Sequence, residues 1–287
     1  MMAHRSSILA LALTIVASAC SVDRTATTSQ AIIGGETSDP SEFPATGMLV
    51  VGNELRCTAT LIAPDVALTA AHCLEAPMYG EFRFTLDTDA SNGIADQIPL
   101  KAYHQHPDFN GSVDAFVDLA TRNDIGLIIL ERPVENVAPE PIDAPGLQTF
   151  FDTGSQLAMC GYGRLTWRTG AFALKRDAEV IVDRVEDHEF ATTADDPQPC
   201  NGDSGAPLFA DTPTGRRLVG VVSRAMGRSE RCDTGAIITR VAPYAQWIVE
   251  SSLDRDPGDC NAGGGSSILP LGVLWALNVW RRRRTPR

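Results

Sequence analysis

The heptapeptide Asn201-Gly202-Asp203-Ser204-Gly205-Ala206-Pro207 decides how the rest of this sequence is interpreted. A serine hydroxyl is a weak nucleophile unless a base takes its proton and nearby amides receive the charge that develops. Glycines on both sides of Ser204 permit a tight turn that points the amides of Gly202 and Ser204 at one oxygen atom. The stretch predicts either a nucleophile loop or an ordinary turn rich in Gly, Pro and Asp.

A histidine and an aspartate upstream supply what a nucleophile loop requires. His72 stands in Ala70-Ala71-His72-Cys73, where two small residues leave room for the imidazole. Histidine titrates near neutral pH and can both take and return a proton. Asp124 precedes the apolar run 125–130, and a carboxylate there would hold the imidazole in the tautomer that faces the serine. A lone aspartate before a strand is otherwise usually a turn residue.

These motifs, in the order His72, Asp124 and Ser204, resemble those of the trypsin/chymotrypsin family of serine proteases. The resemblance implies a serine endopeptidase with these three residues as its catalytic triad and the amides of Gly202 and Ser204 as its oxyanion hole. The alternative from another functional class is a binding module that keeps the protease fold without cutting its partner. A nucleophile elbow of the type Gly-x-Ser-x-Gly is excluded because Ala206 occupies the place of its second glycine.

The stretch Ala31-Ile32-Ile33-Gly34-Gly35 is similar to the activation site of the same family. The resemblance implies a zymogen in which cleavage after Ala31 frees the ammonium group of Ile32 to pair with Asp203. A buried carboxylate is costly without such a partner, so we expect the nucleophile loop to form only after cleavage. The alternative is that these residues merely begin a strand.

The resemblance also assigns a pocket for the side chain that precedes the scissile bond. Its floor is Gln198, six residues before Ser204, where trypsin has an aspartate. The walls are Ser223, Ala225 and Ala236. We therefore expect cleavage after small or medium uncharged side chains rather than after Lys or Arg, unless a bulge brings Asp195 or Asp196 into the pocket.

Seven cysteines give an odd count. The resemblance implies two disulfides, Cys57–Cys73 beside the histidine and Cys200–Cys232 beside the pocket. In the chain-entropy model, closing the loop of the first disulfide stabilises the folded state by about 3 kcal/mol. Cys160 has no partner in the family pattern and is expected to be a buried free thiol.

The body of the chain has a sequence pattern typical of an all-β protein, because short apolar runs are separated by turn residues. These runs are 48–51, 59–62, 66–69, 125–130, 178–182 and 218–222. Helical spacing appears only at 241–250, with Pro243 early and Trp247 and Ile248 on the buried side. We predict two packed six-stranded antiparallel β-barrels and a C-terminal helix within residues 32–250.

The formal net charge of −12 argues against a nucleic-acid partner. The expected partners are protein or peptide substrates, and the chain is expected to be a monomer. His104 and His106 form a His-x-His pair, but a proline and a turn follow at once, so we expect no metal site. No cofactor is expected.

The two ends of the sequence resemble targeting segments. Residues 1–19 are typical of a signal peptide and residues 20–31 of a pro-segment, although Cys20 also resembles the lipidated cysteine of a bacterial lipoprotein. A polar linker, 251–267, precedes an apolar and arginine-rich tail, 268–287. The tail resembles a Gram-negative sorting signal of the myxobacterial type, with a plain membrane anchor as the alternative. The protein is therefore expected to be secreted or attached to the cell surface.

Overall fold

The computed structural model describes residues 32–254, except 78, 91–92, 112–118, 145–149, 165–173, 196 and 228–231. The expected signal peptide, pro-segment and tail lie outside these residues. So does most of the linker.

The first half of the described chain forms a closed antiparallel barrel. Its strands are β2 (Thr46–Val51), β3 (Glu54–Ala63), β4 (Val66–Thr69), β5 (Phe82–Thr85), β6 (Ile98–Gln105) and β7 (Gly126–Leu130). They pair in the order β2-β3-β4-β7-β6-β5, and β5 returns to β2. All five residues of β7 are buried, which fits a strand with the barrel interior on one side and the C-terminal helix on the other.

The second half forms another barrel. Its strands are β8 (Gln156–Gly161), β9 (Arg176–Val185), β10 (Glu189–Thr192), β11 (Pro207–Thr212), β12 (Gly215–Ala225) and β13 (Ala236–Arg240). The order is β9-β10-β13-β12-β11-β8, and pairing of β8 with β9 closes the barrel. The short strand β1 (Glu36–Thr37) adds to β9 from outside.

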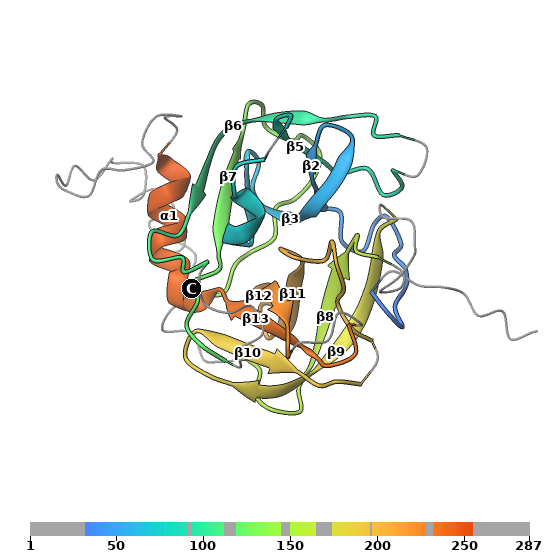
Figure 1. The fold of residues 1–287 in the computed structure, drawn as a ribbon, viewed down its shortest axis with the longest axis vertical. Coiled ribbons are helices and arrows are strands. Elements are labelled where there is room, and N and C mark those ends of the chain that lie inside the picture. The colour runs from blue at the N-terminus through green and yellow to red at the C-terminus, as the bar shows by residue number, and fades with distance from the viewer. Residues whose placement is uncertain are drawn as a thin grey trace, which may run out of the picture.

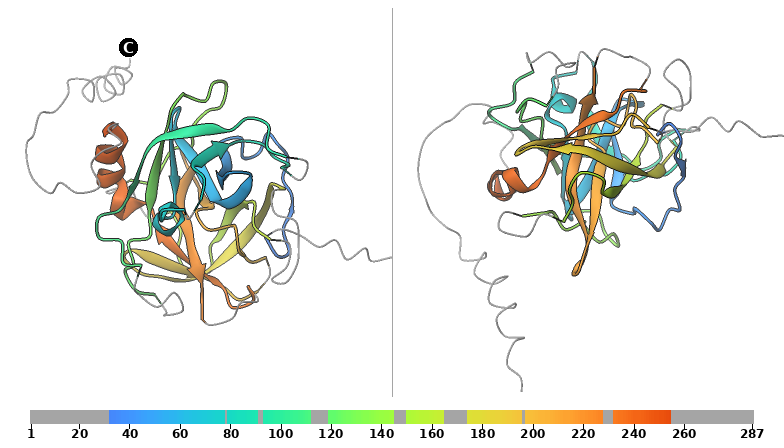
Figure 2. Two further views of the ribbon diagram at one scale, coloured as in Figure 1. Left: turned by 45° about the horizontal axis from the view of Figure 1, so that its top comes forward. Right: turned by 90° about the horizontal axis from the view of Figure 1, so that it is seen from below.

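The predicted fold is confirmed. In Figure 1 the first barrel lies above the second, and in the right-hand view of Figure 2, seen from below, the two overlap. A single cluster of buried side chains runs between them and includes Leu61 and Leu127 of the first barrel with Phe209 and Val221 of the second. All six predicted apolar runs lie in strands, although β7 begins one residue later than the run at 125–130.

The C-terminal helical segment consists of two consecutive elements. The 3-10 turn η2 (Ala242–Tyr244) carries Pro243, and α1 (Ala245–Leu253) follows it. Ile248 is buried and Trp247 partly buried against the first barrel, as the helical spacing predicts. Figure 1 shows α1 beside β6 and β7, so that the helix joins the end of the second barrel to the first. Within the described residues, no helix has both the length and the apolar character needed to cross a membrane.

Candidate active site

The nucleophile loop lies between the two barrels and is tied to the first one by Thr58 of β3. The amide of Thr58 donates to the carbonyl of Ser204 at 2.8 Å, and its hydroxyl donates to the carbonyl of Gly202 at 3.1 Å. Gly205 adopts φ +82°. A Cβ there would collide with the carbonyl oxygen of Thr58 and the hydroxyl of Thr69, so only glycine fits this crossing point.

The His72 imidazole is held by Asp124. His72 belongs to the 3-10 turn η1 (Ala71–Leu74), which follows β4. Its Nδ1 lies 2.8 Å from Oδ2 of Asp124, and its backbone amide donates to Oδ1 at 2.9 Å. The carboxylate thus contacts both the ring and the backbone of one residue, which fixes the ring and its tautomer.

The backbone before Asp124 is also fixed. Asn123 adopts φ +53°, a conformation that asparagine tolerates better than most residues. Its side-chain amide donates to the carbonyl of Asp108, and its side-chain oxygen accepts from the hydroxyl of Tyr244 at 2.9 Å. The loop is therefore clamped from two sides immediately before the carboxylate.

Two hydroxyl groups of the second barrel complete the surroundings of Asp124. Ser223 donates to Oδ2 at 2.6 Å, and Thr239 donates to the backbone carbonyl at 3.1 Å. The sequence assigned Ser223 to the substrate pocket and left Thr239 unassigned. The local sequence carries no signal for either contact, because both depend on how β12 and β13 approach the first barrel.

The Asp124 side chain is completely buried. Burial alone would raise the pKa of its carboxyl. The charge of His72 and the hydrogen bonds from His72 and Ser223 outweigh this effect and hold the pKa below its ordinary value. Asp124 is therefore a carboxylate at neutral pH, able to stabilise an imidazolium.

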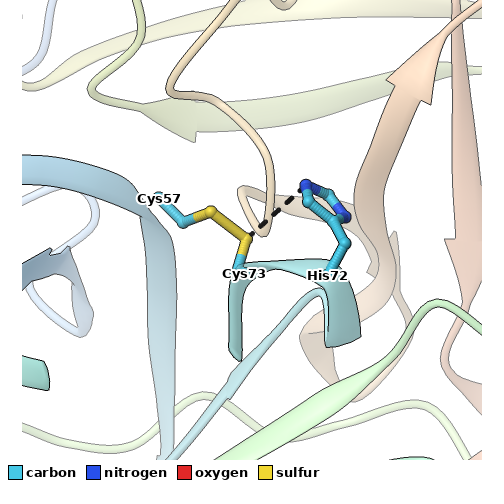
Figure 3. Close-up of side chains that lie close together, drawn as sticks. All are labelled: Cys57, His72 and Cys73. Atoms are coloured by element: carbon cyan, nitrogen blue, oxygen red, sulfur yellow. Dashed lines mark hydrogen bonds between the residues drawn. A yellow bond between two sulfur atoms is a disulfide. The ribbon is translucent and has the colours of Figure 1, made fainter. Parts of the chain in front are cut away.

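The other ring nitrogen of His72 faces the neighbouring disulfide. Figure 3 shows Nε2 directed at Sγ of Cys73, 3.8 Å away. Cys73 is bonded to Cys57, and disulfide sulfurs offer no thiolate to a metal, so the cluster is not a metal site. His72 and Ser204 are both described, and no hydrogen bond joins their side chains. Such bonds are often long before substrate binds.

The amides assigned to the oxyanion hole are available. Gly202 adopts φ +98°, and Ser204 follows the buried Asp203. Within the part of the chain that the structure describes, neither the amide of Gly202 nor that of Ser204 donates to a protein acceptor. Two free, neighbouring amides can stabilise a negative oxygen.

Asp203 is buried between the nucleophile loop and the chain around Gly161 and Gly163. It accepts hydrogen bonds from the amides of Gly163 at 2.8 Å and Cys200 at 2.9 Å. No cation contacts it within the described residues. Burial raises the pKa of its carboxyl to about 7, because these amides offset only part of the desolvation.

Ile32 already occupies the core of the second barrel. Its side chain is fully buried with Leu157, Met159 and Ala206, and its backbone adopts φ +47°. The carbonyl of the next residue, Ile33, accepts a hydrogen bond from the amide of Gln198 at 2.8 Å. The start of the predicted protease domain thus packs beside both the nucleophile loop and the predicted pocket.

Three of the four residues expected to form the pocket, Ser223, Ala225 and Ala236, lie on the paired strands β12 and β13. Ala225 of β12 pairs with Ala236 of β13, whose amide donates to the hydroxyl of Thr192. Gln198 is buried, and its Nε2 donates to the carbonyls of Thr193 and Asp195. The Asp195 side chain is exposed, unlike that of Gln198, and Asp196 lies outside the described residues.

Both expected disulfides are present, Cys57–Cys73 and Cys200–Cys232. The fifth described cysteine, Cys160, is a buried free thiol as expected, and burial raises its pKa. A thiol in this state is a poor nucleophile.

The two residues of the His-x-His pair separate. His104 Nε2 lies 3.1 Å from the carbonyl oxygen of Asp254, whereas His106 packs edge-on against Tyr244 and Trp247. Between residues 109 and 121, only 109–111 and 119–121 are described.

Comparisons with known proteins identify the family and the fold. A family model described as Trypsin matches residues 32–248. Granzyme M of Homo sapiens is 29% identical over 238 residues, which cover 76% of this chain and 87% of that protein. The suppressor of tumorigenicity 14 protein homolog of Bos taurus is 28% identical over 252 residues, and the match covers 78% of this chain but only 28% of that protein. The solved structure of neuropsin, a serine protease of mouse brain, shares the fold, with a TM-score of 0.63 at 22% identity, covering 77% of this chain and all of that one.

Proposed function

The chain belongs to the trypsin family of serine proteases, and on that premise we propose that it hydrolyses peptide bonds with Ser204, His72 and Asp124 as its catalytic triad. The observation that carries the proposal is the pair of contacts from His72 to Asp124, at 2.8 and 2.9 Å, beside a glycine-flanked serine with free amides.

The reaction proceeds through an acyl-enzyme. The hydroxyl of Ser204 attacks the scissile carbonyl while His72 takes its proton, and the amides of Gly202 and Ser204 stabilise the negative oxygen of the tetrahedral intermediate. His72 then gives the proton to the leaving amine as the carbon–nitrogen bond breaks. Water repeats the sequence on the ester and releases the acid. Asp124 stays ionised throughout and stabilises the imidazolium.

The chain is made as a zymogen in this proposal. Hydrolysis after Ala31 gives Ile32 an ammonium group, which pairs with the buried Asp203. The uncompensated burial of that carboxylate supports the idea, because the carboxylate gains most from a nearby cation. Because the residue before this bond is the small, uncharged Ala31, we expect the bond to be cut by the protease itself or by an activator with the same preference. A purified Ser204→Ala chain that still loses residues before Ile32 would contradict self-activation.

The substrate pocket prefers small or medium uncharged side chains. The neutral Gln198 at its floor supports this, as does the exposure of Asp195. A peptide series that varies only the residue before the scissile bond tests it. Dominance of arginine peptides by about tenfold or more would contradict the proposed preference.

The terminal segments are the basis for proposing that the protein is secreted or attached to the cell surface. Residues 1–19 act as a signal peptide, 20–31 as a pro-segment, 251–267 as a linker and 268–287 as a sorting tail of the bacterial type, around the protease domain of residues 32–250. The relatives named above are eukaryotic, so the bacterial origin rests on the terminal motifs alone. Mass spectrometry of the mature C-terminus tests removal of the tail, and incorporation of a labelled fatty acid tests lipidation of Cys20.

A fluorophosphonate probe, which reacts with activated serines, tests the catalytic proposal directly. We expect the chain cleaved before Ile32 to be labelled at Ser204, and the Ser204→Ala and His72→Ala variants to remain unlabelled. If the cleaved wild-type chain is folded and unlabelled, the protein is instead a binding module with a protease fold.

A further inference from the structure

Four charged residues form a buried cluster around the triad. Arg122, Asp124, Glu189 and Arg224 are each less than 10% exposed. Charged side chains are seldom buried to this extent unless they are paired. Apart from Asp124, these residues do not belong to the triad, and their arrangement was not predicted from the sequence.

Glu189 of β10 anchors the cluster. Its two carboxylate oxygens accept from the two terminal nitrogens of Arg224 at 2.9 Å each. The same oxygens accept from the backbone amides of Ala120 at 3.0 Å and Arg122 at 3.4 Å. Glu189 therefore fixes the backbone that carries Arg122 as well as the side chain of Arg224.

The guanidinium of Arg122 lies next to the triad carboxylate. Its Nη1 is 3.8 Å from Oδ2 of Asp124. Its Nε donates to the carbonyl of Asn110, and the group lies over the ring of Phe109, 5.3 Å from the centroid. Because the group is held on three sides, it cannot turn away from Asp124 without losing these contacts.

The second cation reaches the same carboxylate through a hydroxyl. Arg224 donates to the oxygen of Ser223 at 3.3 Å, and Ser223 donates to Oδ2 of Asp124 at 2.6 Å. The cluster thus contains two cations and two anions, and it is electrically balanced while His72 is neutral. A proton on His72 adds a positive charge to a region with low exposure, where such charges interact strongly.

We propose that Arg122 is a positioning residue that acts through Asp124, because its charge offsets that of the carboxylate and so favours the neutral imidazole of His72. The inference deepens the proposed protease function and rests on it for its catalytic meaning. The other titratable or charged groups packed around this region include Arg56, Glu75, His106, Asp108, His188 and Tyr244. None of these is in ion-pair contact with Asp124 among the described residues, which leaves Arg122 as the nearest cation apart from His72.

The test uses the full, uncleaved chain carrying Ser204→Ala, so that it does not depend on hydrolysis. Nuclear magnetic resonance of labelled histidines follows protonation of His72, whose signal is identified by its loss in a His72→Gln chain. We expect Arg122→Gln to move the midpoint of the His72 titration upward by about one pH unit. Arg122→Lys keeps the charge and should move it by less than half as much.

Arg132→Gln is the matched control, because it also removes one positive charge but from an exposed pair with Asp96. It should leave the His72 midpoint in place. An unchanged midpoint in Arg122→Gln would overturn the inference, and so would equal shifts in the Gln and Lys variants. Should Arg122→Gln fail to fold, Arg122→Met retains the aliphatic stem and answers the same question.

A second measurement separates this inference from the proposed function. With the cleaved wild-type chain and a peptide amide bearing alanine before the scissile bond, the acid limb of the kcat/KM profile should move upward by the same amount in Arg122→Gln. A wild-type chain that hydrolyses nothing contradicts the proposed function, while the resonance experiment still decides the role of Arg122.

Discussion

Two aspartates in this molecule are equally buried and differ in almost everything else. Asp124 and Asp203 are both completely inaccessible. Burial raises the pKa of each carboxyl, but a histidine and a hydroxyl lower that of Asp124 below its ordinary value, whereas Asp203 has only backbone amides and its pKa rises to about 7. Burial alone therefore does not decide the charge of a carboxyl group, because the partners within reach decide it.

The site therefore has one aspartate whose interaction partners are all present and one that lacks a partner. Asp124 has every partner that it needs in the uncleaved chain. Asp203 lacks a cation among the described residues and, under the proposed mechanism, acquires one only when Ile32 gains an ammonium group. The following experiments act on one aspartate or the other.

The largest effect is expected from Asp124→Asn in the cleaved chain. The amide keeps the shape of the side chain but favours the wrong tautomer of His72, and kcat should fall by about 10⁴-fold. Steady-state hydrolysis of a peptide amide measures the loss. A fall of less than about tenfold would show that Asp124 is not the orienting group.

Asp203→Asn should cost the cleaved chain about 10²–10³ in kcat. Without the ion pair to Ile32, the loop no longer holds the oxyanion amides in place, and losing one such donor has an effect of this size. The uncleaved chain, in which the pair cannot form, should respond much less. Equal losses in both forms would contradict the activation mechanism.

The stability of the uncleaved chain should fall as pH rises between about 4 and 7. The pKa of Asp203 is higher in the folded chain than in the unfolded one, so the folded state binds the extra proton in this window, and the stabilisation is present below it and lost through it. For a rise in the pKa of Asp203 from 3.8 to about 7, the loss is on the order of 4 kcal/mol. Denaturant unfolding at several pH values measures it, and Asp203→Asn should remove this part of the slope.

The smallest effect is expected from Ser223→Ala. Loss of the 2.6 Å hydrogen bond removes one charge-assisted donor from Asp124 but leaves both contacts from His72. Bonds to charged groups contribute about 1.5–3 kcal/mol, so kcat/KM should fall by roughly tenfold to a hundredfold. A change of less than twofold would mean that the hydroxyl only fills space.

Much of the site could be predicted because its chemistry is written in short motifs. Each of the motifs around His72, Asp124 and Ser204 can be recognised from a few adjacent residues. The apolar runs located six of the strands. The cysteine pairs followed from the resemblance. Two of the other strands were missed for a physical reason. Phe82–Thr85 carries an arginine and Glu189–Thr192 begins with a glutamate, and such residues are typical of surfaces.

The buried charged cluster escaped for the same reason. Nothing near Arg122, Glu189 or Arg224 in the sequence separates them from solvated residues, because their partners come from distant parts of the chain. Ser223 was assigned to the substrate pocket from the sequence, and the structure shows its hydroxyl donating to Asp124. Local sequence identifies reactive groups well and identifies their long-range neighbours poorly.

The backbone of Ile32 gives cleavage a second meaning. A β-branched residue at φ +47° is strained, by about 1–3 kcal/mol at such positions. The torsion φ is defined by the carbonyl carbon of the preceding residue, so hydrolysis after Ala31 removes the torsion itself. The cut chain can keep the Ile32 side chain in the same place with no strain to release. Cleavage therefore lowers the free energy of the conformation in which the Ile32 side chain is buried, because breaking the bond removes the backbone strain.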